Sequence, residues 1–176
     1  MITDNFYVIT GAMGSGKSTL LQRFRTLGFQ VMEEPARRVL ADQRRISNGI
    51  PCRDARLFVD LMLSKAIDDY TVAGNHSGPV IFDRGIPDNL GYAALSGFDY
   101  LPAQKAAQEY RYNSRVFFVP AWEQIYTNDE ERTMSFALAS DFGDILRGIY
   151  QTLGYDLIEV PCVSAEERVQ FILGFL

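Results

Sequence analysis

The segment that most constrains this chain is residues 11–18, which read GAMGSGKS and fit the pattern G-x-x-x-x-G-K-[ST] in full. The apolar run before it, residues 6–10, predicts a β-strand, and a helical pattern opens at Thr19. The segment therefore joins a strand to a helix N-terminus, where backbone N–H groups and the helix dipole can surround phosphate oxygens. A glycine-rich turn that fits by chance is the alternative. The strand before it and the helix after it favour a phosphate-binding loop.

The positions of this loop predict the ligands. We expect Lys17 to reach the β- and γ-phosphates and to act in catalysis, and the Ser18 hydroxyl to bind Mg²⁺. ATP and Mg²⁺ are the expected cofactors, although the sequence does not separate adenine from guanine. The residues expected to contact the nucleotide are Gly11, Ala12, Met13, Gly14, Ser15, Gly16, Lys17, Ser18 and Thr19.

Strand-like and helix-like segments alternate along the chain. The expected strands are residues 6–10, 29–32, 80–83, 115–119 and 155–160, and the main expected helices are 35–46, 53–72, 86–96, 103–112, 131–153 and 164–171. The alternation predicts an α/β fold: a P-loop NTPase with a five-stranded parallel sheet and helices on both faces. A length of 176 residues, 47% of them hydrophobic, suits a single domain over residues 1–176.

Composition excludes several other classes of function. The net charge of −5 argues against a nucleic-acid partner, and no apolar run is long enough to span a membrane. Cys52, Cys162 and the single histidine His76 do not support a disulfide framework, a zinc site or a Cys–His catalytic pair. We expect a cytoplasmic protein, and the oligomeric state stays open.

Two acidic residues are expected at the edge of the sheet where the phosphate loop lies. Asp83 ends the strand 80–83, so its carboxylate can hold Mg²⁺ or take a proton from a substrate hydroxyl. Capping the next helix is the alternative role for Asp83. Glu34 follows the strand 29–32 and is expected to act in catalysis and to contact the substrate. The alternative for Glu34 is an acid that stabilises a helix N-terminus.

Basic and aromatic side chains complete the predicted site. Arg84, directly after Asp83, is expected to bind an anionic group of the substrate, with an exposed salt bridge as the alternative. Arg37 lies one helical turn after Glu34 and either binds substrate or pairs with that carboxylate. Tyr92 is expected to stack on an aromatic acceptor, unless it belongs to the core. The run Pro161-Cys162-Val163, after the fifth strand, is expected to line an adenine pocket.

A lid is expected at about residues 121–133. Arg132 lies there, in the run Asp129-Glu130-Glu131-Arg132, and is expected to stabilise the charge on the transferred phosphoryl group. A charge cluster at a helix start is the alternative. In either case the segment joins the fourth strand to the long helix that follows.

Several motifs together resemble one family. They are residues 11–18 and the runs EEPAR at 33–37, FDRGIPD at 82–88, ERT at 131–133 and LGYDLIEVP at 153–161. They look like the small P-loop ATP-binding proteins labelled AAA, which are related to the nicotinamide riboside kinase domain of the NAD-biosynthesis regulator NadR. The resemblance implies a nucleotide-kinase-like fold, an Asp83 strand beside the phosphate-loop strand, Mg-ATP as ligand and a lid with Arg132. Ile125-Tyr126 is followed by Thr127-Asn128 where such lids often carry a second basic residue, so one lid arginine remains.

Three functions follow from these observations. The first is a kinase that transfers the γ-phosphoryl group of ATP to a hydroxyl of a nucleoside-like small molecule. The second is an ATP-binding regulatory switch without a small-molecule acceptor. The third is a protein–protein adaptor with a vestigial loop. A GTPase is disfavoured because the fourth strand ends Val119-Pro120-Ala121-Trp122 and not in Asn-Lys-x-Asp.

Overall fold

The structure is a computed structural model and describes residues 3–44, 53–126 and 134–176. Its strands are β1 (Phe6–Gly11), β2 (Gln30–Met32), β3 (Val80–Asp83), β4 (Arg115–Val119) and β5 (Asp156–Glu159). Its helices are α1 (Lys17–Thr26), α2 (Pro35–Gln43), α3 (Ala55–Ala73), α4 (Asp88–Leu95), α5 (Leu101–Glu109), α6 (Phe136–Thr152) and α7 (Ala165–Leu173), with a 3-10 turn η1 (Glu123–Ile125).

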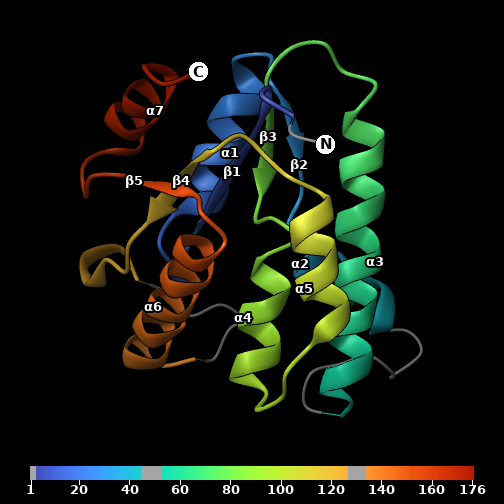
Figure 1. Cartoon of the computed structure of the whole chain (residues 1–176). Coiled ribbons are helices and arrows are strands. Elements are labelled where there is room, and N and C mark those ends of the chain that lie inside the picture. The colour runs from blue at the N-terminus through green and yellow to red at the C-terminus, as the bar shows by residue number, and fades with distance from the viewer. Residues whose placement is uncertain (1–2, 45–52, 127–133) are drawn as a thin grey trace.

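The strands form one parallel sheet in the order β2-β3-β1-β4-β5 (Figure 1). β1 is central, pairing with β3 on one side and β4 on the other, and every residue of it is buried. Burial on both faces explains why this run is continuously apolar and does not alternate. The predicted five-stranded parallel sheet is confirmed, and so is the expected place of the Asp83 strand beside the phosphate-loop strand.

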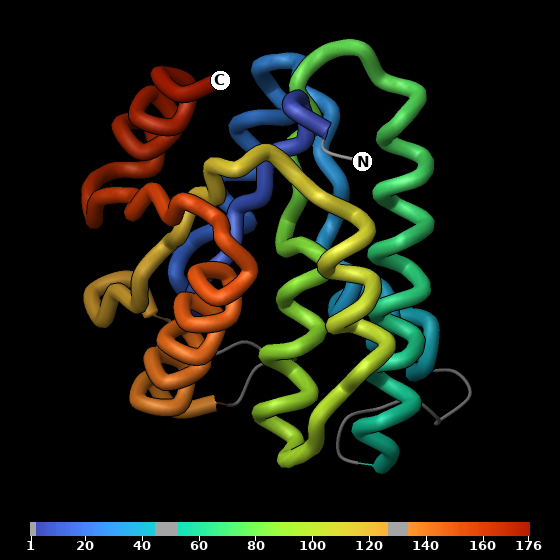
Figure 2. The backbone as a smooth tube through the Cα atoms, viewed as in Figure 1, coloured from blue at the N-terminus to red at the C-terminus, as the bar shows by residue number. Residues whose placement is uncertain are grey.

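Helices cover both faces of this sheet, as predicted. Tyr7 and Ile9 of β1 pack with Leu20 and Phe24 of α1, and with side chains of α7. Phe6 and Val8 point to the other face and join side chains of α2, α3, α4, α5 and α6. Figure 2 shows α7 and α3 on opposite sides of the strands. Full burial of each large apolar side chain contributes roughly 1.5–3 kcal/mol, so these two layers hold the strand ends in place.

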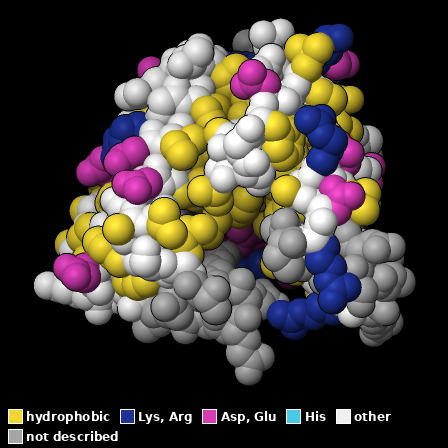
Figure 3. Space-filling view, turned by 90° about the horizontal axis from the view of Figure 1, so that it is seen from below, with side chains coloured by type: hydrophobic (Ala, Val, Ile, Leu, Met, Phe, Trp, Pro, Cys, Tyr) yellow, Lys and Arg dark blue, Asp and Glu magenta, His cyan; other side chains and the backbone are white. Residues whose placement is uncertain are grey.

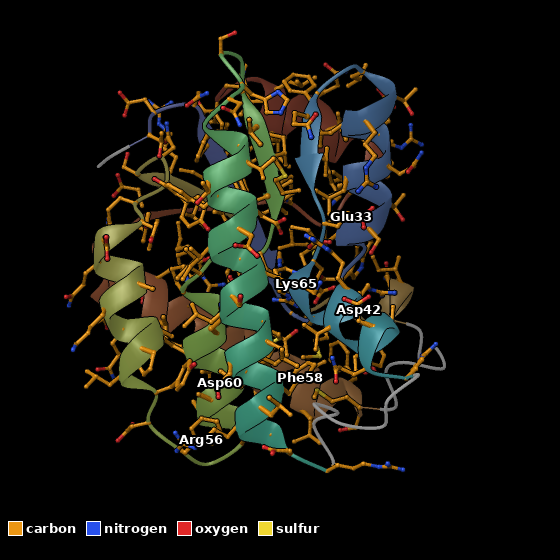
Figure 4. All side chains as sticks on the ribbon, turned by 90° about the vertical axis from the view of Figure 1, so that its right-hand side faces the viewer. Glu33, Asp42, Arg56, Phe58, Asp60 and Lys65 are labelled. Atoms are coloured by element: carbon orange, nitrogen blue, oxygen red, sulfur yellow. The ribbon has the colours of Figure 1, made fainter. Side chains whose placement is uncertain are left out.

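Ion pairs fix α2 against α3, and with it the residues at the end of β2. Lys65 on α3 lies 2.7 Å from a carboxylate oxygen of Asp42 on α2, and the two side chains lie close together in Figure 4. Arg38 of α2 donates to both carboxylate oxygens of Asp69 at 2.6 Å. Because α2 starts at Pro35, these contacts hold Glu34 near the sheet edge.

Most helix boundaries differ by a few residues from the expectation, and two of the helix starts have a clear physical reason. α5 begins at Leu101, not at Ala103, because Pro102 lies in the first turn of the helix, where its missing N–H costs no hydrogen bond. α6 begins at Phe136, after Ser135, whose side chain accepts from the N–H of Leu138. The expected start of that helix at Glu131 falls outside the described residues, and Met134 precedes the helix. None of the helices in the described ranges is long and apolar enough to cross a bilayer.

Ser164 begins the last helix with a reciprocal cap. Its hydroxyl accepts from the N–H of Glu167 at 3.3 Å, and the Glu167 carboxylate accepts from the N–H of Ser164 at 3.1 Å. The two bonds satisfy donors that the first turn of a helix leaves without partners. The expected start of this helix at residue 164 agrees with the structure, where Ser164 is the N-cap.

We expect Ser164→Ala to lower the free energy of unfolding by about 1 kcal/mol, because the N–H of Glu167 loses its acceptor. Urea denaturation of the variant and the parent protein measures the difference. Ser114→Ala, at a serine just before β4, is the control. A loss for Ser164→Ala no greater than for this control would contradict a stabilising cap.

Candidate active site

The phosphate loop is shaped by glycines with positive φ. Gly11 has φ +124°, and an added Cβ there would lie 2.1 Å from the carbonyl oxygen of Val119 on β4. Gly16 has φ +83° and is the N-cap of α1, so the helix starts at Lys17. Only glycine adopts these conformations without strain, and only glycine leaves room beside β4. The motif therefore folds as the sequence predicted, at the N-terminal end of α1.

Lys17 lies inside the loop that precedes it. Its side-chain nitrogen donates to the carbonyl oxygens of Ala12 at 2.5 Å and Gly11 at 3.4 Å, and to the Ser15 hydroxyl at 3.3 Å. The residue is buried. These contacts keep the ammonium group at the centre of the loop, where phosphate oxygens would meet it.

A cavity of about 480 Å³ opens above this loop. Gly14, Ser15, Gly16, Lys17, Ser18 and Thr19 line one side, while Gly11, Ala12 and Met13 are buried behind them. Trp122 and Ile125 line another side, and Val163, Ser164, Ala165 and Arg168 a third. The volume lies in the range of small-molecule and cofactor sites.

The wall of this cavity near residues 161–163 agrees with the expectation in part. In the part of the chain that the structure describes, Pro161 does not line the cavity, and Val163 of the same loop does. Trp122 and Arg168 were not predicted from the sequence. The sequence does carry a signal for Arg168. It is a basic residue on the face of α7 that is otherwise apolar and buried, with Val169 and Ile172.

Arg168 connects α7 to the phosphate loop. It is 3% exposed, and its Nη2 donates to the carbonyl oxygen of Ser15 at 3.1 Å. Burial lowers the pKa of the Arg168 guanidinium from its ordinary value. The centre of the guanidinium lies 6.0 Å from the ring of Trp122. The last helix thus holds one side of the loop and one wall of the cavity.

We expect Arg168→Ala to weaken nucleotide binding about tenfold, because the Ser15 carbonyl loses its buried donor and the cavity loses part of its wall. Isothermal titration with Mg-ATP measures the dissociation constant. Arg115→Ala, which removes an exposed arginine bonded to a carbonyl of Phe175, is the control. Equal affinities for the two variants would show that Arg168 does not support the loop.

A second cavity of about 250 Å³ adjoins the first. Ser18, Glu34 and Arg37 line both cavities, and Asp83, Glu33 and Arg25 line the second. Seen from below in Figure 3, the molecule is hollowed on this side, with acidic and basic side chains visible within the hollow. The structure thus brings together at one edge of the sheet the residues that the sequence placed there.

Ser18 and Asp83 fit a magnesium ion. Both line the second cavity, and they offer a hydroxyl and a carboxylate oxygen beside the phosphate loop. Mg²⁺ in nucleotide sites is bound through one or two carboxylates together with phosphate oxygens and water, so a larger set of protein ligands is not required. Among the described residues there is no group of three or more His, Cys, Asp or Glu side chains that could hold a metal ion by itself.

Glu34 is a buried carboxylate with several donors around it. It is 3% exposed. Its Oε1 accepts from Nε of Arg84 at 2.9 Å and from the hydroxyl of Tyr92 at 3.2 Å, and its Oε2 accepts from Nε of Arg37 at 3.3 Å. Of the two roles expected for Arg37, the pairing with Glu34 is confirmed. Arg37 also lines both cavities.

Arg84 is buried and has an unusual backbone conformation. Its φ is +68°, the only positive value outside glycine among the described residues. Its Nη1 donates to Asp88 Oδ1 at 2.9 Å and to the carbonyl oxygen of Gly11 at 3.0 Å. Burial alone would lower its pKa, but Tyr92, Glu34, Asp88 and Asp83 together hold that pKa well above its usual range. The alternative of an exposed salt bridge is wrong, and binding of an anionic substrate group stays a prediction.

Asp88 is a further residue of this site to which sequence reasoning gave no role, although it ends the run FDRGIPD. It accepts from the hydroxyls of Thr10 and Tyr150, each at 2.6 Å, and from the N–H of Gly85 at 2.9 Å. Burial, with Asp88 nearby, raises the pKa of Tyr150 well above its usual range, so that hydroxyl remains a donor. The Asp88 carboxylate thus bonds the turn before α4 through the N–H of Gly85, and the N-cap of that helix is Pro87, which makes no side-chain hydrogen bond. Asp83 lies four residues before Pro87 and is not itself the N-cap of α4.

The predicted lid is described only in part. Residues 121–126 form the turn η1 and its flanks, and Trp122 and Ile125 line the first cavity. Arg132, the expected lid arginine, lies outside the described residues. Its role in phosphoryl transfer stays a prediction.

Comparison with known families gives a match over most of the chain. A family model described as an AAA domain matches residues 6–168. The chain belongs to this AAA-domain family. A search of curated proteins found no significant match to this AAA domain.

Several solved structures share this fold, among them a deoxyadenosine kinase and a shikimate kinase. NadR protein in complex with NR superposes with a TM-score of 0.75 at 16% identity, covering 98% of this AAA domain and 51% of that chain. Deoxyadenosine kinase from M. mycoides gives 0.66 at 16% identity, with 97% of each chain covered. Shikimate kinase from Acinetobacter baumannii gives 0.59 at 16% identity, covering 98% and 92%. The fold is therefore that of P-loop nucleotide kinases.

Proposed function

We propose that this AAA domain is a Mg-ATP-dependent kinase that transfers the γ-phosphoryl group to a hydroxyl of a nucleoside-like small molecule. The observation that carries the proposal is the second cavity, which adjoins the phosphate-loop cavity and contains the carboxylates of Glu34 and Asp83. A protein that only hydrolyses ATP needs room for one water molecule there. A cavity of about 250 Å³ has room for the reacting part of a second substrate.

In this proposal the residues of the phosphate loop bind and orient ATP. The backbone N–H groups of residues 14–19 and the ammonium group of Lys17 surround the phosphates. Ser18 and Asp83 would hold Mg²⁺, which neutralises charge on the β- and γ-phosphates when it is bound. Arg132 would add positive charge to the transferred group.

The transfer step exchanges one P–O bond for another. The acceptor hydroxyl oxygen forms a bond to the γ-phosphorus, and the bond from that phosphorus to the β,γ-bridging oxygen breaks, which leaves ADP. The hydroxyl proton goes to a carboxylate of the second cavity, Glu34 or Asp83. Arg37, Arg84 and Tyr92 hold Glu34 in place and would position the acceptor beside it.

The nature of the structural neighbours supports a small-molecule acceptor over a regulatory switch. A deoxyadenosine kinase, a shikimate kinase and NadR share the fold across nearly the whole of this AAA domain. Two of these proteins are named for phosphoryl transfer to a hydroxyl-bearing small molecule. The nucleoside among them favours a nucleoside-like acceptor here.

The test is incubation with Mg-ATP and a panel of nucleosides, sugar alcohols and vitamins, with ADP formation and product mass read together. We expect ADP and one phosphorylated acceptor in equal amounts. ADP without a phosphorylated acceptor, or bound ATP without turnover, would contradict the kinase and support the ATP-binding switch. The Lys17→Ala variant gives the background rate.

A further inference from the structure

A small hollow lies between α2, α3 and α4, beside the second cavity. Its walls include Pro35, Met62, Arg84, Asn89 and Tyr92. Arg84 and Tyr92 of these walls bond the carboxylate of Glu34, which lines the second cavity, so the hollow lies next to the proposed acceptor site. Its volume of about 10 Å³ is close to the room that one water molecule or one polar end group of a ligand requires.

Two buried polar atoms of these wall residues have no hydrogen-bond partner within the described ranges: Nη2 of Arg84 and Oδ1 of Asn89. Both residues are 3% exposed. Such atoms are costly to bury, because each loses its bonds to water without replacing them. One is a donor and the other an acceptor, and they belong to side chains that line the same hollow.

The neighbours of each group fix its orientation. The Asn89 amide nitrogen donates to the carbonyl oxygen of Ile86 at 3.0 Å, so the amide oxygen is the atom left for a ligand. The Nε and Nη1 atoms of Arg84 are bonded to Glu34, Asp88 and the Gly11 carbonyl. The rings of Phe142 and Tyr92 lie 5.4 and 5.9 Å from the guanidinium carbon. Nη2 is therefore the part of Arg84 that remains available.

We infer that this hollow recognises the end of the acceptor molecule through both atoms, Nη2 of Arg84 donating to the ligand and Oδ1 of Asn89 accepting from a ligand N–H. The matching chemistry is an amide, lactam or amino-heterocycle edge, as on a nucleobase or a carboxamide. This inference rests on the proposed kinase function, and it assigns Asn89 as a specificity-determining residue of the acceptor site.

Charge argues against a carboxylate in the hollow. The carboxylates of Glu34 and Asp88 already share the single guanidinium of Arg84, and Asp83 lies beside it in the chain. A ligand carboxylate would add negative charge there. Its oxygen atoms, which only accept hydrogen bonds, would also face the Asn89 oxygen, which needs a hydrogen-bond donor. An acid of the shikimate type is thus a poor fit at this end of the site.

The simplest alternative is a structural water that bridges the two atoms. It would satisfy both groups, and then acceptor binding would not depend on Asn89. The two accounts therefore predict different results for ligands that differ only at the amide edge.

The first experiment uses the parent protein with matched ligands. We measure binding by calorimetry in the presence of a non-hydrolysable ATP analogue, and phosphorylation by product mass with ATP. One pair is a pyridine nucleoside carrying a carboxamide and the same nucleoside carrying a carboxylate. The other is adenosine and purine riboside, which lacks the exocyclic amine. We expect at least tenfold tighter binding of the amide or amine member in at least one pair.

The second experiment uses Asn89→Ala. We expect the affinity for the preferred ligand to fall about 10- to 100-fold, with the affinity for ATP unchanged. Asn75→Ala is the matched control, because Asn75 likewise donates to a carbonyl three residues earlier but is exposed on the far end of α3. The ligand pairs need no variant, so the test stands even if Asn89→Ala fails to fold.

The outcomes separate this inference from the proposed function. Selective, Asn89-dependent binding without phosphorylation would support the recognition site and contradict the kinase. Phosphorylation that ignores both the amide edge and Asn89 would support the kinase and overturn the recognition site. Preference for the carboxylate ligand, or no binding of any member of the pairs, would also overturn it.

Discussion

Replacing Lys17 by alanine should remove the stabilisation of this protein by Mg-ATP. At an ATP concentration one hundred times the dissociation constant, ligand binding stabilises a protein by about 2.7 kcal/mol. For a chain of this size, that corresponds to a rise in Tm of about 5–10 °C. Without the ammonium group at the centre of the loop, we expect no measurable rise in a thermal unfolding experiment.

The control for this experiment is Lys65→Ala. Lys65 pairs with Asp42 on the outer side of α2 and does not line the nucleotide cavity. The Lys65→Ala variant should keep the full rise in Tm with Mg-ATP. Both variants should unfold cooperatively without ligand. An unchanged rise in the Lys17 variant would show that the loop does not bind the phosphates.

Replacing Arg84 by alanine should destabilise the fold by about 3–5 kcal/mol, a large part of the total stability of a domain. The substitution leaves the carboxylates of Glu34 and Asp88, each with 3% side-chain exposure, without their shared guanidinium. Asp88 keeps its bonds from Thr10 and Tyr150, but it loses the opposite charge. Urea denaturation gives the difference in the free energy of unfolding.

Arg37→Ala is the matched control, because Arg37 bonds the same Glu34 carboxylate from an exposed position. The Arg37 side chain is 37% exposed, and a pair of this kind contributes about 0–1 kcal/mol. The double variant Glu34→Gln/Arg84→Ala should lose less stability than the sum of its single changes, because no buried charge then remains at Glu34. Equal losses for Arg37→Ala and Arg84→Ala would contradict a buried charge network.

The sequence was sufficient for the fold because its signals are local. The run 6–10 is apolar throughout, and it forms the buried central strand β1. Gly11 and Gly16 lie where only glycine fits, and Ser164 lies where a helix needs a cap. Each of these features follows from a few adjacent residues, and so it can be predicted without knowing the rest of the chain.

Much of the site depends on contacts between distant segments. Arg168 bonds a carbonyl that lies 153 residues earlier, and Tyr150 bonds Asp88 across 62 residues. No local pattern specifies such pairs. The position of Arg84 after β3 was predicted, but the left-handed backbone that directs its side chain to Glu34 and Asp88 was not. Nor could the sequence show which residue of the run 161–163 lines the cavity.

The contact between Arg168 and the phosphate loop also sets an order of events during synthesis. Arg168 is added to the growing chain 153 residues after Ser15 of the loop. At ~5–20 residues per second, this interval is roughly 8–30 s. During that time the nascent chain carries a complete phosphate-loop motif but lacks one wall of the nucleotide cavity. The proposed nucleotide site is thus completed only after the segment that carries Arg168 has been translated, long after the phosphate loop itself.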